Sequence, residues 1–400
     1  METFHGMNLP LQLKQALDRN NLFIPTPIQA QAIPLALQGK DIIGSAQTGT
    51  GKTMAFAIPL IEKLLNKSHV GSALIIVPTR ELAQQVVGEI KKLLLQNSQL
   101  RTALLIGGEP IPKQFSQLHR RPRVIIGTPG RIIDHIDRKT LITHNINTIV
   151  LDETDRMLDM GFGIQIENIM KYLPRTRQTL MFSATFPSDI EKLATKYLNN
   201  PERVSIEFEI SASEKIKQEV VYASESEKYD KLSEQLRQRE GSIIIFVKTK
   251  RGADQLASRL YKDDYSALAI HGDLRQHKRE SVINSFRRGR SQIMVATDIA
   301  SRGLDIPHVQ HVINYDAPQS QADYIHRIGR TARAGAEGFA LSFILPQDKS
   351  SLTDKEGKLN FDCKAQPKKI KKICRKRSTQ RVKVGKRRAF ALKKRSKLAY

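Results

Sequence analysis

Short apolar runs alternate with longer amphipathic stretches along this chain. Residues 41–44, 72–77, 124–127, 148–151 and 178–182 are predicted to be buried strands, and residues 81–95 carry apolar side chains at helical spacing. The alternation returns after residue 214, with predicted strands at 242–247, 266–270, 292–296, 311–314 and 339–344 and helices at 252–261 and 275–288. Strands that alternate with helices indicate a parallel sheet covered on both faces. The predicted fold class is therefore α/β, with two tandem parallel-sheet domains.

Changes in composition indicate where these domains end. Residues 207–218 (EFEISASEKIKQ) are polar and lack a strong period, so we place a short linker at 210–213. The domains are predicted at 1–209 and 214–348. After Pro346 the apolar periodicity fades, and residues 349–400 are predicted to be a disordered basic tail. A chain of 400 residues exceeds what one hydrophobic core normally supports, which agrees with two domains.

Positive charge is concentrated in the tail. The formal net charge is +25, and residues 364–400 contain 17 Lys or Arg and no Asp or Glu, so 25 − 17 leaves +8 for residues 1–363. Such a tail suits a polyanion, because binding releases the condensed counterions. A tail that only improves solubility, an anionic membrane surface and a nuclear address are the alternatives. The tail has few large apolar residues, which disfavours the membrane.

Several classes of protein are disfavoured by what the sequence lacks. No apolar run has the length that a bilayer requires, and the first ten residues do not resemble a secretory signal. The two cysteines, Cys363 and Cys374, have no second ligand pair for zinc and cannot form a disulfide framework. We therefore expect a cytoplasmic protein that works in a reducing environment.

Residues 46–53 (AQTGTGKT) form a candidate phosphate-binding loop between a predicted strand and a predicted helix. Backbone N–H groups converge in such a turn, and the helix dipole favours negative charge. Lys52 is expected to reach the β- and γ-phosphates of ATP, and Thr53 to ligate Mg²⁺. The strict pattern has Gly where Ala46 stands, and an ordinary Gly-rich turn is the alternative. The other predicted nucleotide contacts in the loop are Gln47, Thr48, Gly49, Thr50 and Gly51.

Two carboxylates, Asp152 and Glu153, follow the predicted strand at 148–151. Ligands bind at this end of the strands in open α/β sheets. Asp152 is suited to hold Mg²⁺, and Glu153 can orient and deprotonate an attacking water. A solvated acidic turn is the alternative, and the phosphate loop upstream makes it the weaker interpretation.

In this order, the motifs resemble those of the DEAD-box RNA helicases of superfamily 2, and the likeness spans residues 4–338. Residues 25–29 (PTPIQ) resemble the adenine-reading Q motif, residues 152–155 (DETD) the motif that names the family, and residues 326–333 (HRIGRTAR) motif VI. The resemblance implies two RecA-like domains and an RNA-stimulated ATPase that locally unwinds RNA duplexes. Residues 156–162 (RMLDMGF) favour a bacterial-type member.

The resemblance also implies roles for particular residues. Arg330 and Arg333 of motif VI are expected to act as arginine fingers, which complete a catalytic set with Lys52, Asp152 and Glu153. Further nucleotide contacts are expected from Phe4, Ile24, Gln29 and Asp305. RNA contacts are expected from Pro78, Thr79, Arg80, Gly108, Thr128, Arg131, Arg279 and Thr297. Ser183, Thr185 and His326 are expected to couple hydrolysis to strand separation.

The sequence departs from the family pattern at two places. Asn21 and Leu22 stand where the family usually has Gly and an adenine-stacking aromatic residue, and Phe23 is adjacent. Thr154 replaces the Ala of the DEAD motif, and its hydroxyl needs a hydrogen-bond partner if it is buried. The first departure bears on base selectivity and nucleotide affinity, and neither bears on the reaction.

We expect ATP and RNA each to favour a closed arrangement of the two domains, so that each strengthens binding of the other. Expected partners are RNA, with little sequence specificity, and ribosomal or RNA-decay assemblies, with no DNA and no membrane. The alternatives are an RNA clamp that does not unwind, a DNA translocase or helicase, and a nucleotide-binding protein without a nucleic-acid partner. The basic charge and the motifs in both halves make the last of these the weakest.

Overall fold

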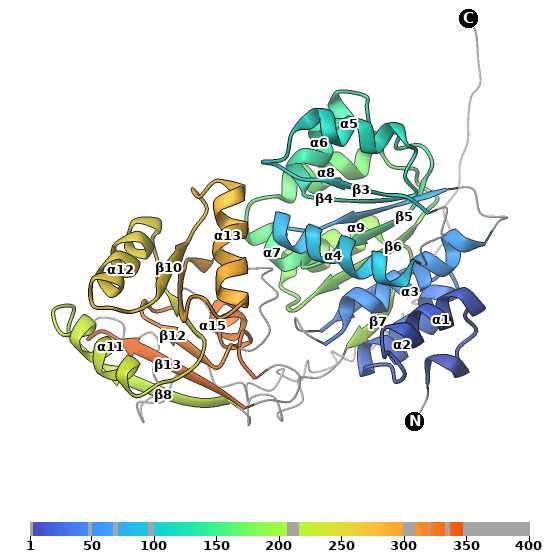
Figure 1. The fold of residues 1–400 in the computed structure, drawn as a ribbon. Coiled ribbons are helices and arrows are strands. Elements are labelled where there is room, and N and C mark those ends of the chain that lie inside the picture. The colour runs from blue at the N-terminus through green and yellow to red at the C-terminus, as the bar shows by residue number, and fades with distance from the viewer. Residues whose placement is uncertain are drawn as a thin grey trace, which may run out of the picture. The chain divides into compact units, whose positions relative to one another are not determined.

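The fold contains two separate parallel sheets, one from each half of the chain (Figure 1). The computed structural model describes residues 3–46, 50–66, 71–94, 100–205, 216–298, 309–318, 321–332 and 337–346. The α/β class with two parallel-sheet domains, expected from the alternation of strands and helices, is confirmed.

The first sheet has seven strands in the order β3-β4-β2-β5-β6-β1-β7, and every neighbouring pair is parallel. Its strands are β1 (Ile42–Ser45), β2 (Ser72–Ile76), β3 (Thr102–Leu105), β4 (Val124–Gly127), β5 (Ile146–Leu151), β6 (Gln178–Ser183) and β7 (Glu202–Ser205). Parallel strands need crossover connections, and helices supply them here. All carboxyl ends of these strands therefore lie at one edge.

Helices cover both faces of this sheet. The connecting elements are η1 (Phe4–Gly6), α1 (Leu11–Arg19), α2 (Pro27–Leu37), α3 (Lys52–Leu65), α4 (Arg80–Leu93), α5 (Ile111–His119), α6 (Pro129–Asp137), α7 (Thr154–Asp159), α8 (Gly163–Tyr172) and α9 (Ser188–Tyr197). Successive strand side chains point to opposite faces, so Ala73 and Ile75 join one hydrophobic cluster and Leu74 and Ile76 join the other.

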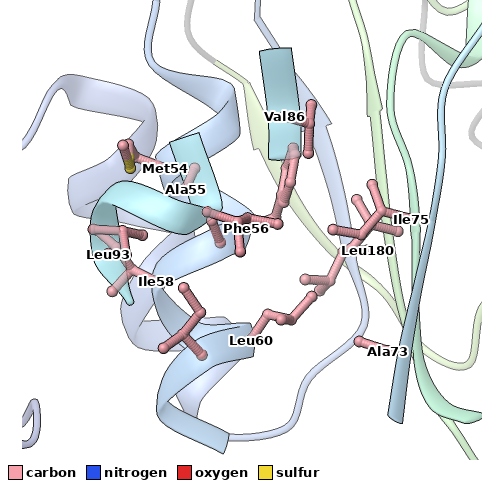
Figure 2. Close-up of a cluster of buried hydrophobic side chains, with 14 of the residues drawn as sticks. Met54, Ala55, Phe56, Ile58, Leu60, Ala73, Ile75, Val86, Leu93 and Leu180 are labelled. Carbon is pink, nitrogen blue, oxygen red and sulfur yellow. The ribbon is translucent and has the colours of Figure 1, made fainter. Parts of the chain in front are cut away.

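Figure 2 shows part of the first of these clusters. Phe56 of α3 and Val86 of α4 point toward Ile75 and Leu180 of the sheet. The second cluster gathers side chains from α6 to α9. Because both faces are buried, the central strands are continuously apolar rather than alternating, which is why they stand out in the sequence.

The second sheet has six strands in the order β10-β11-β9-β12-β13-β8, again parallel throughout. Its strands are β8 (Ile216–Tyr222), β9 (Ile243–Phe246), β10 (Ala267–Ile270), β11 (Ile293–Ala296), β12 (His311–Asn314) and β13 (Gly338–Ile344). The described helices are α11 (Lys228–Arg237), α12 (Lys250–Lys262), α13 (Gln276–Arg287) and α15 (Gln321–Ile328). Side chains of α11 and α12 pack on one face, and those of α13 on the other.

The predicted strands and helices are found within one or two residues of their expected ends. The sequence interpretation missed β3, β7 and β8. The expected linker at 210–213 and the basic tail from residue 349 lie outside the described residues. No helix in the described ranges is both long and apolar enough to cross a bilayer.

Candidate functional site

The loops at the carboxyl edge of the first sheet carry most of the predicted site. The strand order divides them into two groups. Candidates for nucleotide binding follow β1 and β5, which lie on one side of the sheet with β6 between them. Candidates for RNA binding follow β2, β3 and β4, which are neighbours on the other side. One edge of one sheet thus offers two adjoining sites.

The phosphate loop connects β1 to α3. The Ala46 N–H donates to the Ser183 carbonyl (3.2 Å), which ties the start of the loop to β6. Gly51 has φ +90°, and a Cβ there would clash with Nε2 of Gln29, so glycine is required. Gln29 Nε2 donates to the Gly51 carbonyl (3.0 Å), and Gln29 Oε1 accepts from the Thr26 N–H (2.9 Å). Gln47, Thr48 and Gly49 lie outside the described residues.

Lys52 is the first residue of α3, and only 6% of it is exposed. Its Nζ is buried and has no hydrogen-bond partner among the described residues. A buried ammonium without a partner is costly, and a phosphate oxygen would satisfy it. Thr53 follows it at the start of the same helix, where the dipole also favours an anion. The cradle therefore fits the phosphates of ATP.

Asp152 follows β5 and is buried. Burial raises the pKa of its carboxyl to about 6; Lys52 lowers this pKa and Glu153 raises it further. A carboxylate that is destabilised by burial fits a site that gains a divalent cation when nucleotide binds. The described residues contain no group of three or more His, Cys, Asp or Glu side chains that could hold a metal. Mg²⁺ is commonly held by one or two carboxylates together with phosphate oxygens and water, and Asp152 with Thr53 fits such a site.

Glu153 stands directly before α7 with φ +52°, a left-handed conformation that non-glycine residues rarely adopt. Its Oε2 accepts from Nη1 of Arg156 at 2.5 Å, and both side chains are buried. Burial alone would raise the pKa of Glu153, but Arg156, Lys52 and Arg330 outweigh burial and hold this pKa below its ordinary value. A lowered pKa favours the ionised form of Glu153, which is the form that a residue accepting a proton from water needs.

Arg330 comes from the second half of the chain, two residues after α15, and is buried. Its charge contributes to lowering the pKa of Glu153. The structure thus brings one of the two predicted arginine fingers into the electrostatic environment of the predicted base. His326 lies in α15, and its carbonyl accepts from Arg330 Nε at 3.4 Å. Arg333 and Asp305 lie outside the described residues.

Asp155 links the acidic loop to the loop after β6. Its Oδ2 accepts from the N–H groups of Ala184 (3.1 Å) and Thr185 (3.0 Å) and from the Thr185 hydroxyl (3.1 Å). The Asp155 N–H donates to the Ser183 hydroxyl oxygen (3.2 Å). Ser183 and Thr185, the predicted coupling residues, are therefore attached directly to the acidic motif.

The predicted RNA contacts of the first domain, except Gly108, line a cavity of about 410 Å³. The cavity is lined by Pro78, Thr79, Arg80, Glu81, Gly107, Thr128, Gly130, Arg131, Met160, Phe162, Gly272, Leu274, Gln276 and Arg279. Arginines and backbone near glycines suit a sugar–phosphate chain. The lining residues that were not among the predicted RNA contacts are Glu81, Gly107, Gly130, Met160, Phe162, Gly272, Leu274 and Gln276. Of these, Met160 and Phe162 lie in the RMLDMGF stretch and carry no charge that would have indicated them.

Arg80 and Gly108 are closely packed in this groove. Gly108 has φ +80°, and a Cβ there would lie 2.5 Å from Arg80 Nη1. Arg279, from α13, donates through Nε to Glu81 Oε1 at 2.7 Å and through Nη1 to the His271 carbonyl at 3.2 Å. Thr297 follows β11 and is buried. That Arg279 and Thr297 bind RNA stays a prediction.

Comparison with known proteins agrees with this geometry. Residues 26–193 match the DEAD/DEAH box helicase family, and residues 227–335 match the helicase conserved C-terminal domain. The chain is 45% identical over 351 residues to DEAD-box ATP-dependent RNA helicase CshA of Bacillus subtilis, covering 88% of this chain and 71% of that protein. It is 46% identical over 349 residues to CshA of Geobacillus kaustophilus, covering 87% and 74%. This chain belongs to the family of DEAD-box ATP-dependent RNA helicases.

Solved structures of this helicase family resemble the chain as well. Dbp5 of S. cerevisiae bound to RNA and ADP BeF3 has a TM-score of 0.77 and 32% identity, covering 86% of this chain and 90% of that one. A DEAD box protein from Methanococcus jannaschii has a TM-score of 0.51 and 41% identity, covering 88% and 95%.

The helicase accommodates Thr154, its departure from the DEAD motif, without an unsatisfied group. Thr154 is fully buried, and its hydroxyl lies 3.3 Å from the Leu151 carbonyl and 3.2 Å from the Phe182 carbonyl. The hydroxyl therefore finds the partner that its burial requires. It also joins the start of α7 to the ends of β5 and β6.

The residues near the expected adenine-binding position differ more from the family pattern than Thr154 does. Asn21 stands where the family usually has Gly, and its φ is +55°. Asparagine tolerates this left-handed conformation better than most residues do. Leu22 packs against the core, whereas Phe23 and Ile24 are 50% and 58% exposed. Phe4 is buried in the core, and its N–H donates to the Phe23 carbonyl (3.1 Å). Phe4 thus supports the turn from its core side. Contact of Phe4 or Ile24 with nucleotide stays a prediction.

Proposed function

We propose that this chain hydrolyses ATP in a site completed by Arg330 and Arg333, and that it uses the energy to separate short RNA duplexes. The observation that carries the proposal is the convergence at one place of Lys52, whose Nζ has no hydrogen-bond partner among the described residues, two buried carboxylates and the charge of Arg330. Phosphoryl transfer to water depends mainly on positioning and charge stabilisation, and this set of groups supplies both.

The residues divide the chemistry among them. Lys52 binds the β- and γ-phosphate oxygens, and Asp152 and Thr53 would hold Mg²⁺. When bound, Mg²⁺ neutralises charge on the phosphates. Glu153 orients a water and takes its proton as the oxygen bonds to the γ-phosphorus and the bond to ADP breaks. Arg330 and Arg333 stabilise the charge that spreads over the transferring group. Gln29 fixes Gly51 and has an amide edge suited to adenine.

RNA lies in the groove lined by Thr79, Arg80, Thr128 and Arg131. The Thr79 hydroxyl oxygen accepts from the Leu82 N–H (3.2 Å), so its own proton is available to a phosphate. Contacts of this kind fix the backbone and carry little sequence information, which supports a broad range of RNA substrates. A preference for RNA over DNA would come from contacts to 2′-hydroxyl groups.

ATP and RNA binding are coupled because residues of both halves surround each ligand. Arg330 acts on the nucleotide side, and Arg279 and Gln276 line the RNA groove. Each ligand then strengthens binding of the other by linkage. Strand separation follows when the groove holds one strand in a form its duplex partner cannot join. Hydrolysis removes the γ-phosphate and releases the strand.

The cellular role that suits these properties is remodelling of structured RNA in ribosome assembly or RNA decay, in the cytoplasm. The support is the basic tail, whose 17 Lys or Arg residues suit a large polyanion more than a small ligand.

The test measures ATP hydrolysis and displacement of a labelled strand from a short RNA duplex with wild type and Glu153→Gln. Wild type should hydrolyse ATP faster with single-stranded RNA than with DNA and should displace the strand. Glu153→Gln should lose turnover by about 100-fold or more while still binding ATP and RNA. Rapid turnover in that variant would refute the assigned base. ATP-dependent retention of RNA without displacement would favour the clamp over the helicase.

A further inference from the structure

Two buried polar residues, Gln114 and His135, support the glycine loop of the proposed RNA groove. Gly107 and Gly108 follow β3 and pack against the Arg80 guanidinium. Glycines have no side chain with which to fix their own conformation, and both φ and ψ are free for them. Something else must therefore hold this loop where RNA needs it.

Gln114 of α5 supplies that restraint. Its Nε2 donates to the Ile106 carbonyl (3.0 Å) and to the Glu109 carbonyl (3.2 Å). These two carbonyls flank the glycine pair on either side. Gln114 is 1% exposed and is the buried residue of α5, a position where an apolar side chain would be usual. Burial of this amide is compensated by the hydrogen bonds that it makes to the two carbonyls.

His135 of α6 orients the Gln114 amide. Its Nε2 lies 3.2 Å from Gln114 Oε1, and its Nδ1 lies 2.9 Å from the Thr140 hydroxyl oxygen. The Gln114 Nε2 group donates to the two carbonyls. Gln114 Oε1 is an amide oxygen and can only accept, so His135 Nε2 must carry the proton of their hydrogen bond. The imidazole is completely buried, with the Phe115 ring edge-on at 5.6 Å. The amide therefore cannot flip without losing all three hydrogen bonds.

The same loop also supports the arginines of the groove. Arg80 lies over Gly107 and Gly108, and Arg131 Nη1 donates to the Glu109 carbonyl (3.4 Å). We infer that Gln114, oriented by His135, is a positioning residue for RNA: it fixes the Gly107–Gly108 loop against which Arg80 and Arg131 are arranged. This inference rests on the proposed RNA groove.

The test compares two glutamines of the same helix. Gln114→Met keeps size and removes all three bonds. Gln117→Met is the matched control, because Gln117 Oε1 accepts from the Leu104 N–H of β3 (2.8 Å) rather than binding the carbonyls beside the glycine pair. We expect the RNA concentration for half-maximal ATPase stimulation to rise about tenfold in Gln114→Met, as the loss of two or three net hydrogen bonds implies. The ATP KM and the kcat at saturating RNA should stay within about twofold.

A second pair of variants tests the orienting role. His135→Gln can still donate to Gln114 Oε1 and should keep wild-type RNA half-saturation to within about twofold, whereas His135→Leu cannot donate and should weaken it by about fivefold. If Gln114→Met does not fold, the comparison of His135→Gln with His135→Leu is sufficient to test the inference. An unchanged half-saturation in Gln114→Met and His135→Leu, or an equal rise in Gln117→Met, would overturn the inference. A wild-type ATPase that RNA does not stimulate would instead overturn the proposed function.

Discussion

At the residue scale, the predicted nucleotide site gathers buried charged groups, not all of which have a hydrogen-bond partner among the described residues. Lys52 has no hydrogen-bond partner among the described residues, and burial raises the pKa of Asp152 to about 6. The charge of Glu153 is compensated by Arg156, whose Nη1 lies 2.5 Å from Glu153 Oε2. Strained and uncompensated groups are costly to a fold, and they gather where ligands relieve the cost.

Asp152→Asn should stabilise the chain without nucleotide or metal. The folded pKa of about 6 lies above the ordinary 3.8, so the folded chain binds this proton more tightly than the unfolded chain. Wild-type stability from this group is therefore present below about pH 4 and is lost as pH rises through about 6. Denaturant unfolding should show the variant to be more stable by on the order of 1–3 kcal/mol at about pH 7.5, with the difference vanishing near pH 4. A variant less stable than wild type at both pH values would contradict this.

Arg156→Met should destabilise the chain strongly, because it leaves Glu153 buried without its ion-pair partner. The expected loss in the free energy of unfolding is about 3–5 kcal/mol. Adding Glu153→Gln to Arg156→Met should recover a large part of that loss, since the uncompensated charge is then gone. A double-mutant cycle measured by denaturant unfolding gives the coupling. Additive effects would mean that the pair does not interact as its distance implies.

Residues in contiguous motifs could be predicted from the sequence, whereas the side-chain partners that they meet in the folded chain could not. The positions of Lys52, Asp152 and Glu153 followed from spacing and strand ends. The partners Arg156 and Gln114 did not, because burial of one polar residue in an amphipathic helix leaves no distinctive pattern. Thr154 falls between these cases: its need for a partner was predictable, and the identity of that partner was not.

At the element scale, the central strands were predictable and three edge strands were not. Strands β3 and β7 are the edges of the first sheet, and β8 is an edge of the second. Central parallel strands are buried on both faces and are continuously apolar. The three missed strands are partly exposed, as β8 shows, so their sequences lack that signal. The fourth edge strand, β10, was predicted because its sequence, ALAI, is apolar throughout.

Hydrogen bonds join the acidic motif to the loop after β6, and we expect them to connect ATP hydrolysis with RNA strand separation. The loop after β6 is fastened to α7 through Asp155, whose Oδ2 accepts three hydrogen bonds from Ala184 and Thr185. Replacing Ser183 and Thr185 together by alanine removes both hydroxyls and leaves the backbone contacts. We expect RNA-stimulated ATP turnover to fall by no more than about threefold and strand displacement by about tenfold or more. Equal losses in both assays, measured on the same preparation, would argue against a coupling role.

At the scale of the whole molecule, two sets of proposed contacts combine: those to nucleotide phosphates and those to the RNA backbone. The strand order of the first sheet places their loops side by side at one edge. The second half adds Arg330 near the base, and Gln276 and Arg279 at the groove. In the proposed function, this arrangement links ATP hydrolysis to RNA binding.

Deleting residues 364–400 should weaken RNA binding and flatten its dependence on salt. The deleted segment carries 17 of the Lys and Arg residues and no acidic residue. For single-stranded RNA, the slope of log affinity against log salt should become shallower by about 0.7 for each phosphate that the tail no longer neutralises. RNA affinity measured across a salt series should show the change, and an unchanged slope would reject a role for the tail. ATP binding without RNA serves as the control.

The most direct test of the account is ATP turnover by Arg330→Ala in the full chain, with saturating RNA and with ATP affinity measured in parallel. An arginine that stabilises the transition state should be worth about 100-fold or more in kcat, with ATP affinity changed by only a few-fold. That result would establish a site shared by both halves of the chain. Turnover within about twofold of wild type would contradict it.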